Sequence, residues 1–344
     1  MTCFVIAEIG VNHNGSIDRA KEMVAVAARC GADAVKFQSF DASKLAREGT
    51  PTAEYQRANT GSVDQRAMLE RLQLSHADHL ELKVACDSAG VEFMSSPFDE
   101  DAASMLVDLG VARLKIPSGE LTNLPFLAHL ASFDVPMIMS TGMADLGEVA
   151  EAVATIEAAR AAHSLSDPVS DLLTLLHCTS NYPAAPEDVN LRAMTTLSSE
   201  FALPVGYSDH TAGIAVAPAA VALGASVIEK HFTLDRNLEG PDHRASLEPQ
   251  GLEDMISQIR EVEAAMGDGV KTPRPGELAV RDLVRKSVTT TRDVAEGAVI
   301  GRDDLALLRP GTGIPPKELA DAVGKRATRF LAAGTTITWD DLSP

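Results

Sequence analysis

The feature that most constrains the fold is a regular alternation of short β-rich runs and helical runs along the first three quarters of the chain. Eight runs are short, apolar and bounded by turn residues, which is typical of buried strands. The segments between them carry Ala, Leu, Met and Glu at helical spacing and often end at glycine. The eight predicted strands are residues 4–9, 34–39, 91–95, 113–116, 136–140, 172–178, 204–207 and 226–232. The predicted helices are residues 18–30, 100–109, 146–162, 187–201, 213–224 and 253–266.

Strands that alternate with helices form a parallel sheet with right-handed crossovers. Eight such units over roughly 270 residues is the size of a (β/α)8 barrel. The rival architecture is a doubly wound open sheet, which would carry a glycine-rich fingerprint after its first strand. Residues 9–15 read IGVNHNG, which does not match that fingerprint. The sequence therefore predicts an α/β TIM barrel over residues 1–270.

The last quarter of the chain has a different pattern. Residues 267–276 are rich in Gly and Pro, which is typical of a linker, and we place the linker at residues 271–284. Residues 285–344 are β-like and rich in turns. They contain an internal repeat, residues 296–305 and 333–342, in which a glycine turn and a short strand precede Asp-Asp-Leu. We therefore expect a small, pseudo-symmetric, β-rich second domain.

Charge and composition limit the partners of this chain. It has 30 Lys and Arg against 49 Asp and Glu, a formal net charge of −19. A chain this acidic is a poor general binder of nucleic acid or anionic membranes. Its aromatic content of 4% also argues against a groove that stacks bases. An anionic substrate would need a local group of Lys, His or metal ions that reverses the sign.

The cysteines indicate a reducing compartment. The four of them, Cys3, Cys30, Cys86 and Cys178, lie far apart and include no Cys-x-x-Cys pair. This usage is typical of free thiols in a cytoplasmic protein rather than of disulfides or structural zinc. Residues 1–10 have no basic leader, and the uncharged residues 211–228 are too weakly apolar for a membrane span. We therefore expect a cytoplasmic protein without a membrane segment.

Two histidines end neighbouring predicted strands. In a (β/α)8 barrel the active site lies at the carboxyl ends of the strands. His210 follows the seventh predicted strand and His231 ends the eighth. Because neighbouring strands lie ~4.8 Å apart, both imidazoles could bind one cation; the alternative is two structural histidines. Two histidines with open positions suit catalytic Mn²⁺, or Mg²⁺ or Co²⁺, better than structural zinc. The other histidines expected on the surface or in loops are His13, His76, His79 and His163.

Two lysines lie within predicted strands. Lys36 is in the second strand and Lys115 in the fourth, where an ammonium group without a partner would be costly to bury. Three serines follow the same strand ends: Ser118, Ser140 and Ser208. The lysines and serines could hold a phosphate through charge and hydroxyl donors. The alternative is a set of internal ion pairs with carboxylates at the same ends, such as Glu8 and Glu120.

Ordered motifs cover nearly the whole chain. The first are FVIAEIGVNHNG (residues 4–15), VKFQ (35–38), KIPSGE (115–120) and STGM (140–143). They are followed by LHCT (176–179), YP (182–183), GYSDHT (206–211), EKHFT (229–233) and GPDHRASL (240–247). This ordered set resembles the sialic acid synthase family, the N-acylneuraminate synthases. The tail, with RPGTGI (309–314), resembles the antifreeze-like (SAF) domain that closes these enzymes.

The resemblance implies a metal-dependent, aldol-type condensation of phosphoenolpyruvate with an N-acetylated hexosamine, usually N-acetylmannosamine. The product is a nine-carbon nonulosonic acid, and phosphate leaves by C–O cleavage. His210 and His231 would hold the divalent ion, which acts as a Lewis acid on the open-chain aldehyde. A carboxylate such as Glu120 would stabilise the positive charge that develops at C2.

The resemblance also implies roles for individual residues. The residues that would bind phosphoenolpyruvate are Lys36, Lys115, Ser118, Ser140, Ser180 and Ser208. The side chains that would contact the sugar are Gln38, Tyr182 and Asp242, and the catalytic set would be Glu8, Glu120, His210 and His231. Arg309 would reach the N-acyl group from the SAF domain of the partner subunit, so a homodimer is implied in which each SAF domain closes the other barrel.

The identity of the sugar stays open at this point. AEYQ (residues 53–56) and GPDH (240–243) favour neuraminate or legionaminate enzymes over pseudaminate enzymes without separating the first two. The alternative to a neuraminate synthase is therefore a legionaminate synthase acting on a 2,4-diacetamido-trideoxy hexose. A metal-dependent hydrolase would carry a His-x-His motif on the first strand, which is absent here. A non-catalytic binding protein would not need the full Glu, Lys and His set.

Overall fold

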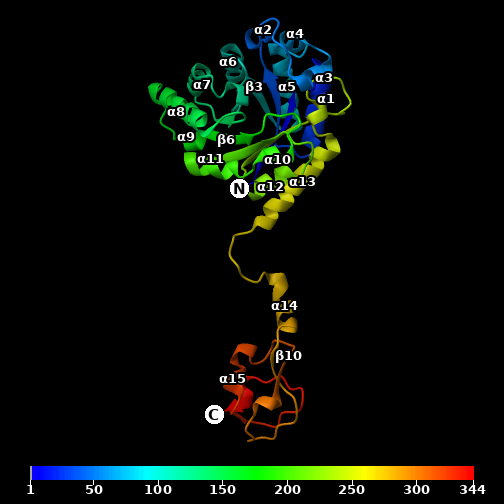
Figure 1. Ribbon diagram of the computed structural model, residues 1–344, viewed down its shortest axis with the longest axis vertical. Helices are drawn as coiled ribbons and strands as arrows, with labels where there is room; N and C mark the ends of the chain where they lie inside the picture. Colours follow the sequence, from blue (N-terminus) through cyan, green and yellow to red (C-terminus); the bar gives the residue numbers. More distant parts are fainter. Residues whose placement is uncertain (1) are drawn as a thin grey trace. The chain divides into compact units, whose positions relative to one another are not determined.

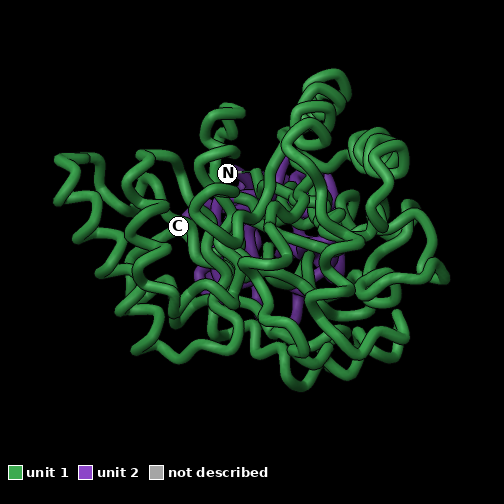
Figure 2. Tube along the Cα trace, turned by 90° about the horizontal axis from the view of Figure 1, so that it is seen from above, with its two compact units in different colours: residues 1–267 green, residues 268–344 purple. Residues whose placement is uncertain are grey.

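The computed structural model describes residues 2–344 and divides the chain into two compact units. The first unit ends at Gly267, and the second is Asp268–Pro344 (Figure 2). The segment that the sequence predicts as a linker contains a helix, α14 (Pro275–Val284), which belongs to the second unit.

The first unit is a (β/α)8 barrel, as predicted. Its eight parallel strands are β1 (Phe4–Gly10), β2 (Ala34–Ser39), β3 (Glu92–Pro97), β4 (Leu114–Ile116), β5 (Met137–Ser140), β6 (Leu173–Cys178), β7 (Val205–Asp209) and β8 (Val227–His231). They are hydrogen-bonded in the order β3-β2-β1-β8-β7-β6-β5-β4. The strands β3 and β4 lie beside each other without a ladder, so the barrel is nearly closed. All eight predicted strands are confirmed, with ends shifted by at most two residues.

Helices surround these strands (Figure 1). They are α1 (Ile17–Arg29), α2 (Ala42–Leu45), α3 (Glu54–Thr60), α4 (Gln65–Glu70), α5 (His76–Ala89), α6 (Glu100–Asp108), α7 (Leu124–Ala131), α8 (Leu146–Ala162), α9 (Val169–Leu172), α10 (Pro186–Val189), α11 (Ala193–Phe201), α12 (Val216–Ala222) and α13 (Pro249–Met266). Short 3-10 turns occur at η1 (Ser118–Glu120) and η2 (His243–Ala245). The single helix predicted over residues 187–201 is instead two helices, because Asn190 ends α10 with a left-handed backbone at φ 49°.

The alternation of side chains along the strands brings polar groups into the barrel. Six residues form an apolar layer inside it: Ile6, Ala34, Met94, Ile138, Leu176 and Val227. Two positions further along the same strands are Glu8, Lys36, Ser96, Ser140, Cys178 and Glu229. Because side chains in a strand alternate between faces, both sets point into the barrel. The inner layer is therefore apolar, and the layer toward the carboxyl ends of the strands is polar.

The connection between β2 and β3 is long and carries four helices, α2 to α5. A small apolar cluster, separate from the main core, is built largely from this connection; it comprises Val11, Phe40, Ala42, Ala46, Met68, Leu69 and Leu72, with Leu45 and Phe98 packed against it. The 14-residue helix α5 was not predicted, and neither were α2, α3 and α4, which are only 4, 7 and 6 residues long. Helices this short give almost no periodic signal.

Two of the histidines expected on the surface or in loops are buried: His79 lies in a helix, and His13 lies in a loop as expected but is not exposed. His79 on α5 is 1% exposed, and its Nε2 lies 2.6 Å from the Ser39 hydroxyl. His13 follows β1 and is also 1% exposed, with its Nδ1 accepting a hydrogen bond from the Gly15 amide. Local polar partners, which the sequence pattern does not reveal, allow these rings to be buried.

The second unit is small and β-rich, as predicted. It contains α14, the antiparallel pair β9 (Ser287–Thr290) and β10 (Leu305–Leu308), the antiparallel pair β11 (Arg326–Ala327) and β12 (Leu342–Ser343), the helix α15 (Leu319–Ala322), and the 3-10 turns η3 (Arg302–Asp304), η4 (Pro316–Glu318) and η5 (Trp339–Asp341). The internal repeat is visible as two equivalent ion pairs, Arg292–Asp304 and Arg329–Asp341. In both copies the Asp-Asp-Leu sequence forms a 3-10 turn followed by a strand.

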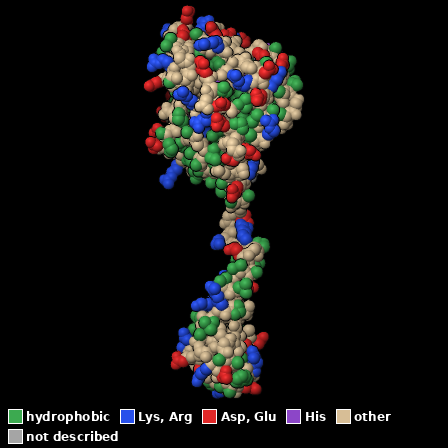
Figure 3. Space-filling model, turned by 90° about the vertical axis from the view of Figure 1, so that its right-hand side faces the viewer, with side chains coloured by type: hydrophobic (Ala, Val, Ile, Leu, Met, Phe, Trp, Pro, Cys, Tyr) green, Lys and Arg blue, Asp and Glu red, His purple; other side chains and the backbone are tan. Residues whose placement is uncertain are grey.

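The surface carries charges of both signs. Acidic and basic side chains are interspersed over the face of the molecule drawn in Figure 3. None of the helices in residues 2–344 is long and apolar enough to span a membrane. All four cysteines are free thiols, as predicted.

Candidate active site

A cavity of about 470 Å³ opens at the carboxyl ends of the barrel strands. Every predicted site residue of the barrel except Glu120 lines it: Glu8, Lys36, Gln38, Lys115, Ser118, Ser140, Ser180, Tyr182, Ser208, His210, His231 and Asp242. The barrel therefore brings together side chains that lie far apart in the chain, from Glu8 on β1 to Asp242 after β8.

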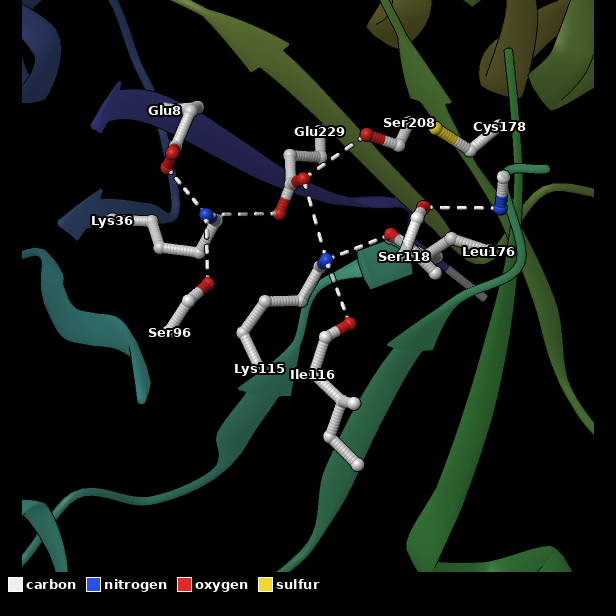
Figure 4. A network of polar contacts seen from close by, with 12 residues as sticks. Glu8, Lys36, Ser96, Lys115, Ile116, Ser118, Leu176, Cys178, Ser208 and Glu229 are labelled. Atoms are coloured by element: carbon white, nitrogen blue, oxygen red, sulfur yellow. Dashed lines mark hydrogen bonds and ion pairs between the residues drawn. The ribbon is translucent and has the colours of Figure 1, made fainter. Parts of the chain in front are cut away.

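Lys36 lies between two carboxylates at the floor of the cavity (Figure 4). Its Nζ is 2.6 Å from an oxygen of Glu8 and 3.8 Å from an oxygen of Glu229. It also donates a hydrogen bond to the Ser96 hydroxyl at 3.1 Å. Lys36 and Glu8 are paired positions of β2 and β1, so the sheet register itself sets this contact.

Lys115 approaches Glu229 from the other side (Figure 4). Its Nζ lies 3.5 Å from Glu229 and donates to the Ser140 hydroxyl at 2.7 Å. Glu229 accepts a further hydrogen bond from Ser208 at 3.0 Å. One buried carboxylate on β8 thus bridges two buried ammonium groups, one on β2 and one on β4.

These contacts shift the pKa values in opposite directions. Burial would raise the pKa of Glu229, but Lys115 and Lys36 lower it to about 2, so this group is ionised. Burial raises the pKa of Glu8 to about 7 despite the neighbouring Lys36. Burial alone would lower the pKa of Lys36, and the two carboxylates raise it. Burial lowers the pKa of Lys115 and Glu229 opposes the shift. The floor therefore holds two lysines against one fully ionised carboxylate, which suits an anionic ligand.

A cradle of polar hydrogens lies beside Lys115. The Gly142 amide donates to the Ser118 hydroxyl at 3.0 Å, and Ser180 lines the same wall. A Cβ atom at position 142 would clash with the Ser180 hydroxyl and would lie 2.7 Å from the Ser118 hydroxyl. Glycine is required here because the serine side chains fill the space that any other residue would need.

His210 and His231 lie side by side at the cavity wall, with ring centroids 5.4 Å apart. The Nδ1 of His210 bonds to the Thr179 carbonyl at 2.8 Å, which leaves its Nε2 for another partner. The Nδ1 of His231 is buried and has no hydrogen-bond partner among residues 2–344. An unpartnered buried imidazole nitrogen next to a second free imidazole nitrogen fits a divalent cation. Among the described residues, no group of three or more His, Cys, Asp or Glu could hold a metal ion.

An aromatic column covers these histidines. The Tyr182 ring packs on His210 with centroids 4.2 Å apart and meets His231 edge-on at 5.6 Å. Tyr55, from α3, stacks on the other side of Tyr182 at 5.2 Å. Asp242 also lines the cavity, and burial raises its pKa to about 6. The column fixes the ring planes of both histidines.

Two predicted residues are not part of this cavity. Glu120 lies in the turn η1 and its carboxylate accepts a hydrogen bond from Asn123 at 2.7 Å, so it is not among the lining residues. This corrects the expectation that Glu120 shares the rim with Glu8. Arg309 belongs to the second unit, where its side chain is exposed. Glu229 ends the same predicted strand as His231 but was given no role in the predicted site, although Val227, Glu229 and His231 alternate on one face of β8.

The comparisons with known proteins agree with this geometry. The NeuB family matches residues 23–271 of the chain, and the SAF domain matches residues 285–343. A barrel whose strand ends carry this set of Lys, Glu, Ser and His therefore belongs to a sialic acid synthase-type enzyme. The chain is a member of the NeuB family, and the predicted resemblance is confirmed.

Three relatives illustrate the range of the family. The chain is 52% identical to N,N'-diacetyllegionaminic acid synthase of Legionella pneumophila, over 99% of this chain and 95% of the relative. It is 37% identical to human N-acetylneuraminate-9-phosphate synthase, over 97% of this chain and 91% of the relative. The crystal structure of N-acetylneuraminic acid synthetase from Leptospira borgpetersenii is similar with a TM-score of 0.70 and 31% identity, covering 81% of this chain and 90% of that one.

Proposed function

We propose that the protein condenses phosphoenolpyruvate with an N-acetylated amino sugar to form a nonulosonic acid and phosphate. The observation that carries this proposal is the pair of buried lysines around Glu229, next to two adjacent imidazoles in one cavity. The lysines would bind an anionic donor, and the imidazoles a cation that activates an aldehyde.

Phosphoenolpyruvate would occupy the floor of the cavity. Lys36 and Lys115 would neutralise its carboxylate and phosphate; Ser140 already accepts a hydrogen bond from Lys115, and Ser208 donates one to Glu229. Ser118 and Ser180 would donate hydroxyl hydrogens to the phosphate. Lys36 and Lys115 now pair with Glu229, and on binding, phosphoenolpyruvate would share their positive charge with that carboxylate.

The acceptor would bind toward the mouth of the cavity. Gln38, Tyr182 and Asp242 line that side, and the Gln38 amide donates to Glu8 at 3.2 Å. His210 and His231 would hold Mn²⁺, Mg²⁺ or Co²⁺ there. The bound cation would supply Lewis-acid polarisation of the open-chain aldehyde.

The residues of the chain would then share the work of the reaction. C3 of phosphoenolpyruvate forms a bond to the aldehyde carbon, and the aldehyde oxygen takes a proton. Glu8, whose pKa is about 7, would donate that proton at neutral pH. The carboxylate of Glu229 would stabilise the positive charge at C2. Water adds to C2 and loses both of its protons as the C2=O bond forms and the C2–O bond to phosphate breaks; one proton returns to Glu8 and the other leaves with phosphate.

We further propose that the acceptor is a 2,4-diacetamido-trideoxy hexose, which makes the protein a legionaminate synthase. The expectation from the motifs was N-acetylmannosamine, with this sugar as the alternative. The 52% identity to a legionaminic acid synthase over nearly the full length supports the alternative. A homodimer with Arg309 acting on the partner's barrel, and a cytoplasmic location, stay predictions; the four free thiols support a reducing compartment.

The test is a phosphate-release assay with phosphoenolpyruvate and three acceptors: the trideoxy sugar, N-acetylmannosamine and its 6-phosphate. We expect acceptor-dependent release that EDTA abolishes and Mn²⁺ restores. With ¹⁸O in the bridging position, the label should leave with phosphate, since the C–O bond breaks. His231→Ala should lose both activity and Mn²⁺ binding, whereas the exposed His163→Ala should retain both. Release without an acceptor, or release unaffected by EDTA, would refute the proposal.

A further inference from the structure

One wall of the cavity differs in chemistry from the rest. It is lined by Val11, Met68, Leu69, Leu72 and Phe98, which we call the apolar wall. All five belong to, or pack against, the small apolar cluster under the connection between β2 and β3. The wall is thus the underside of a packed core, so its shape is fixed before any ligand binds.

Positive charge is absent from this wall. The Lys side chains that line the cavity are Lys36 and Lys115, both on the barrel floor, and no Arg in the described chain lines it. Three cations of the connection are paired elsewhere, Lys44 with Asp99 and Asp101, Arg66 with Glu70 and Lys83 with Asp87. The remaining arginines of the connection are exposed and do not line the cavity: Arg47, Arg57 and Arg71. A phosphate placed against the wall would lose its hydration without gaining a partner.

The five side chains of the wall carry no oxygen or nitrogen, although the neutral amides of Gln56 and Gln65 also line the cavity. Met68 is 3% exposed and Val11 is 4% exposed, and both pack within the apolar cluster; the Met68 sulfur also accepts a contact from the Thr60 hydroxyl at 3.9 Å. A methyl group of the acceptor would bury apolar area here. A hydroxyl in its place would be desolvated without a hydrogen bond. Such a difference in an apolar site changes kcat/KM by about 10- to 200-fold.

We infer that the apolar wall determines acceptor specificity, selecting an unphosphorylated sugar whose distal end is a methyl group. The inference rests on the proposed function. It attributes the choice of acceptor to residues for which neither the family match nor the relatives' names specify a role. Within the wall, Met68 and Val11 are the residues to test as specificity determinants, because each has a polar replacement of similar size. The lysines and serines that would hold the donor are not part of the wall.

The experiment compares kcat/KM for the 6-deoxy acceptor, N-acetylmannosamine and N-acetylmannosamine 6-phosphate. For the wild type we expect a preference of at least about 10-fold for the deoxy sugar over N-acetylmannosamine, and still weaker use of the phosphate. Met68→Gln should reduce the preference about 10-fold, and Met68→Leu, which stays apolar, should keep it. Val11→Thr provides a second isosteric change if Met68→Gln does not fold. The KM for phosphoenolpyruvate should stay within about 2-fold in all variants.

The outcomes separate the two proposals. If no acceptor supports phosphate release by the wild type, the proposed function fails and this inference fails with it. If condensation occurs but the 6-phosphate is used as well as the deoxy sugar, only the inference is overturned. The same holds if Met68→Gln and Val11→Thr are folded and active with an unchanged preference.

Discussion

The Ser208 hydroxyl donates a hydrogen bond at 3.0 Å to the Glu229 carboxylate, across paired positions of β7 and β8. The contact holds the carboxylate where it meets both Lys36 and Lys115. Because both residues are on the rigid barrel and both are 6% exposed or less, the geometry is set by the fold and not by a flexible loop. A carboxylate held in this way is suited to stabilise charge that appears only during the reaction.

Replacing Glu229 tests that role. Glu229→Gln keeps the shape and the contact with Ser208 but removes the negative charge. We expect kcat to fall by about 10²- to 10³-fold, because charge stabilisation at C2 is lost. The KM for phosphoenolpyruvate should stay the same or fall, since the lysines then lack a competing carboxylate. Steady-state kinetics with varied phosphoenolpyruvate measure both constants.

Glu120→Gln is the matched comparison, because the resemblance implies a catalytic role for that residue. Its carboxylate bonds to Asn123 outside the cavity, so we expect a decrease in kcat of less than about 10-fold. A larger loss with Glu120→Gln than with Glu229→Gln would reverse the assignment.

The cradle beside Lys115 gives a second prediction. Gly142→Ala should raise the KM for phosphoenolpyruvate by about 10- to 100-fold, because the added methyl displaces the Ser118 and Ser180 hydroxyls. The KM for the sugar should change little. Gly213→Ala is the control, since an added Cβ there meets no atom within 4 Å. An unchanged KM for phosphoenolpyruvate in Gly142→Ala would place the phosphate elsewhere.

The barrel and most of the cavity could be predicted from the sequence, because both follow from the strand pattern. Once the eight strands are identified, the carboxyl ends converge, and Lys36, Lys115, His210 and His231 must lie near one another. Glu229 could also have been found by the same alternation, since it is two positions before His231 on β8.

Other features could not be read from the sequence. The direction of the Glu120 side chain depends on the turn η1 and its bond to Asn123, which no periodicity encodes. The apolar wall comes from loop residues and from Met68 and Leu69 of the six-residue helix α4, which is too short to give a pattern. The burial of His13 and His79 depends on individual hydrogen bonds to Gly15 and Ser39.

The predicted action of Arg309 in the partner subunit gives a third prediction. Arg309→Ala should raise the KM for the acceptor about 10-fold with little change in kcat, because an exposed guanidinium that binds the N-acyl group contributes affinity. Arg326→Ala, which changes another exposed arginine of the second unit, is the control.

Mixed dimers can show whether Arg309 acts across subunits. Co-expressed Glu229→Gln and Arg309→Ala chains would give heterodimers in which one site has both an intact barrel and the partner's intact arginine. We expect these sites to recover the wild-type KM for the acceptor. No recovery, or a fully active monomer in sedimentation experiments, would exclude action in trans.

The buried His13 gives a prediction for the pH dependence of stability. Burial lowers the pKa of His13 to about 4, and its Nε2 has no hydrogen-bond partner among the described residues. In the unfolded chain the imidazole has a pKa of about 6.5, so between these values the unfolded state binds more protons. The stability that depends on neutral His13 is thus present above pH 6.5 and is lost as the pH falls toward 4. Between pH 7.5 and 5 the wild type should lose about 2 kcal/mol more unfolding free energy than His13→Gln.

Urea unfolding of the metal-free proteins at the two pH values measures this difference. His163→Gln changes an exposed histidine and should follow the wild type at both pH values. His243, whose pKa burial also lowers to about 4, remains in every variant, so part of the acid sensitivity should persist in His13→Gln. If His13→Gln loses as much stability as the wild type between pH 7.5 and 5, the buried neutral state of His13 is contradicted.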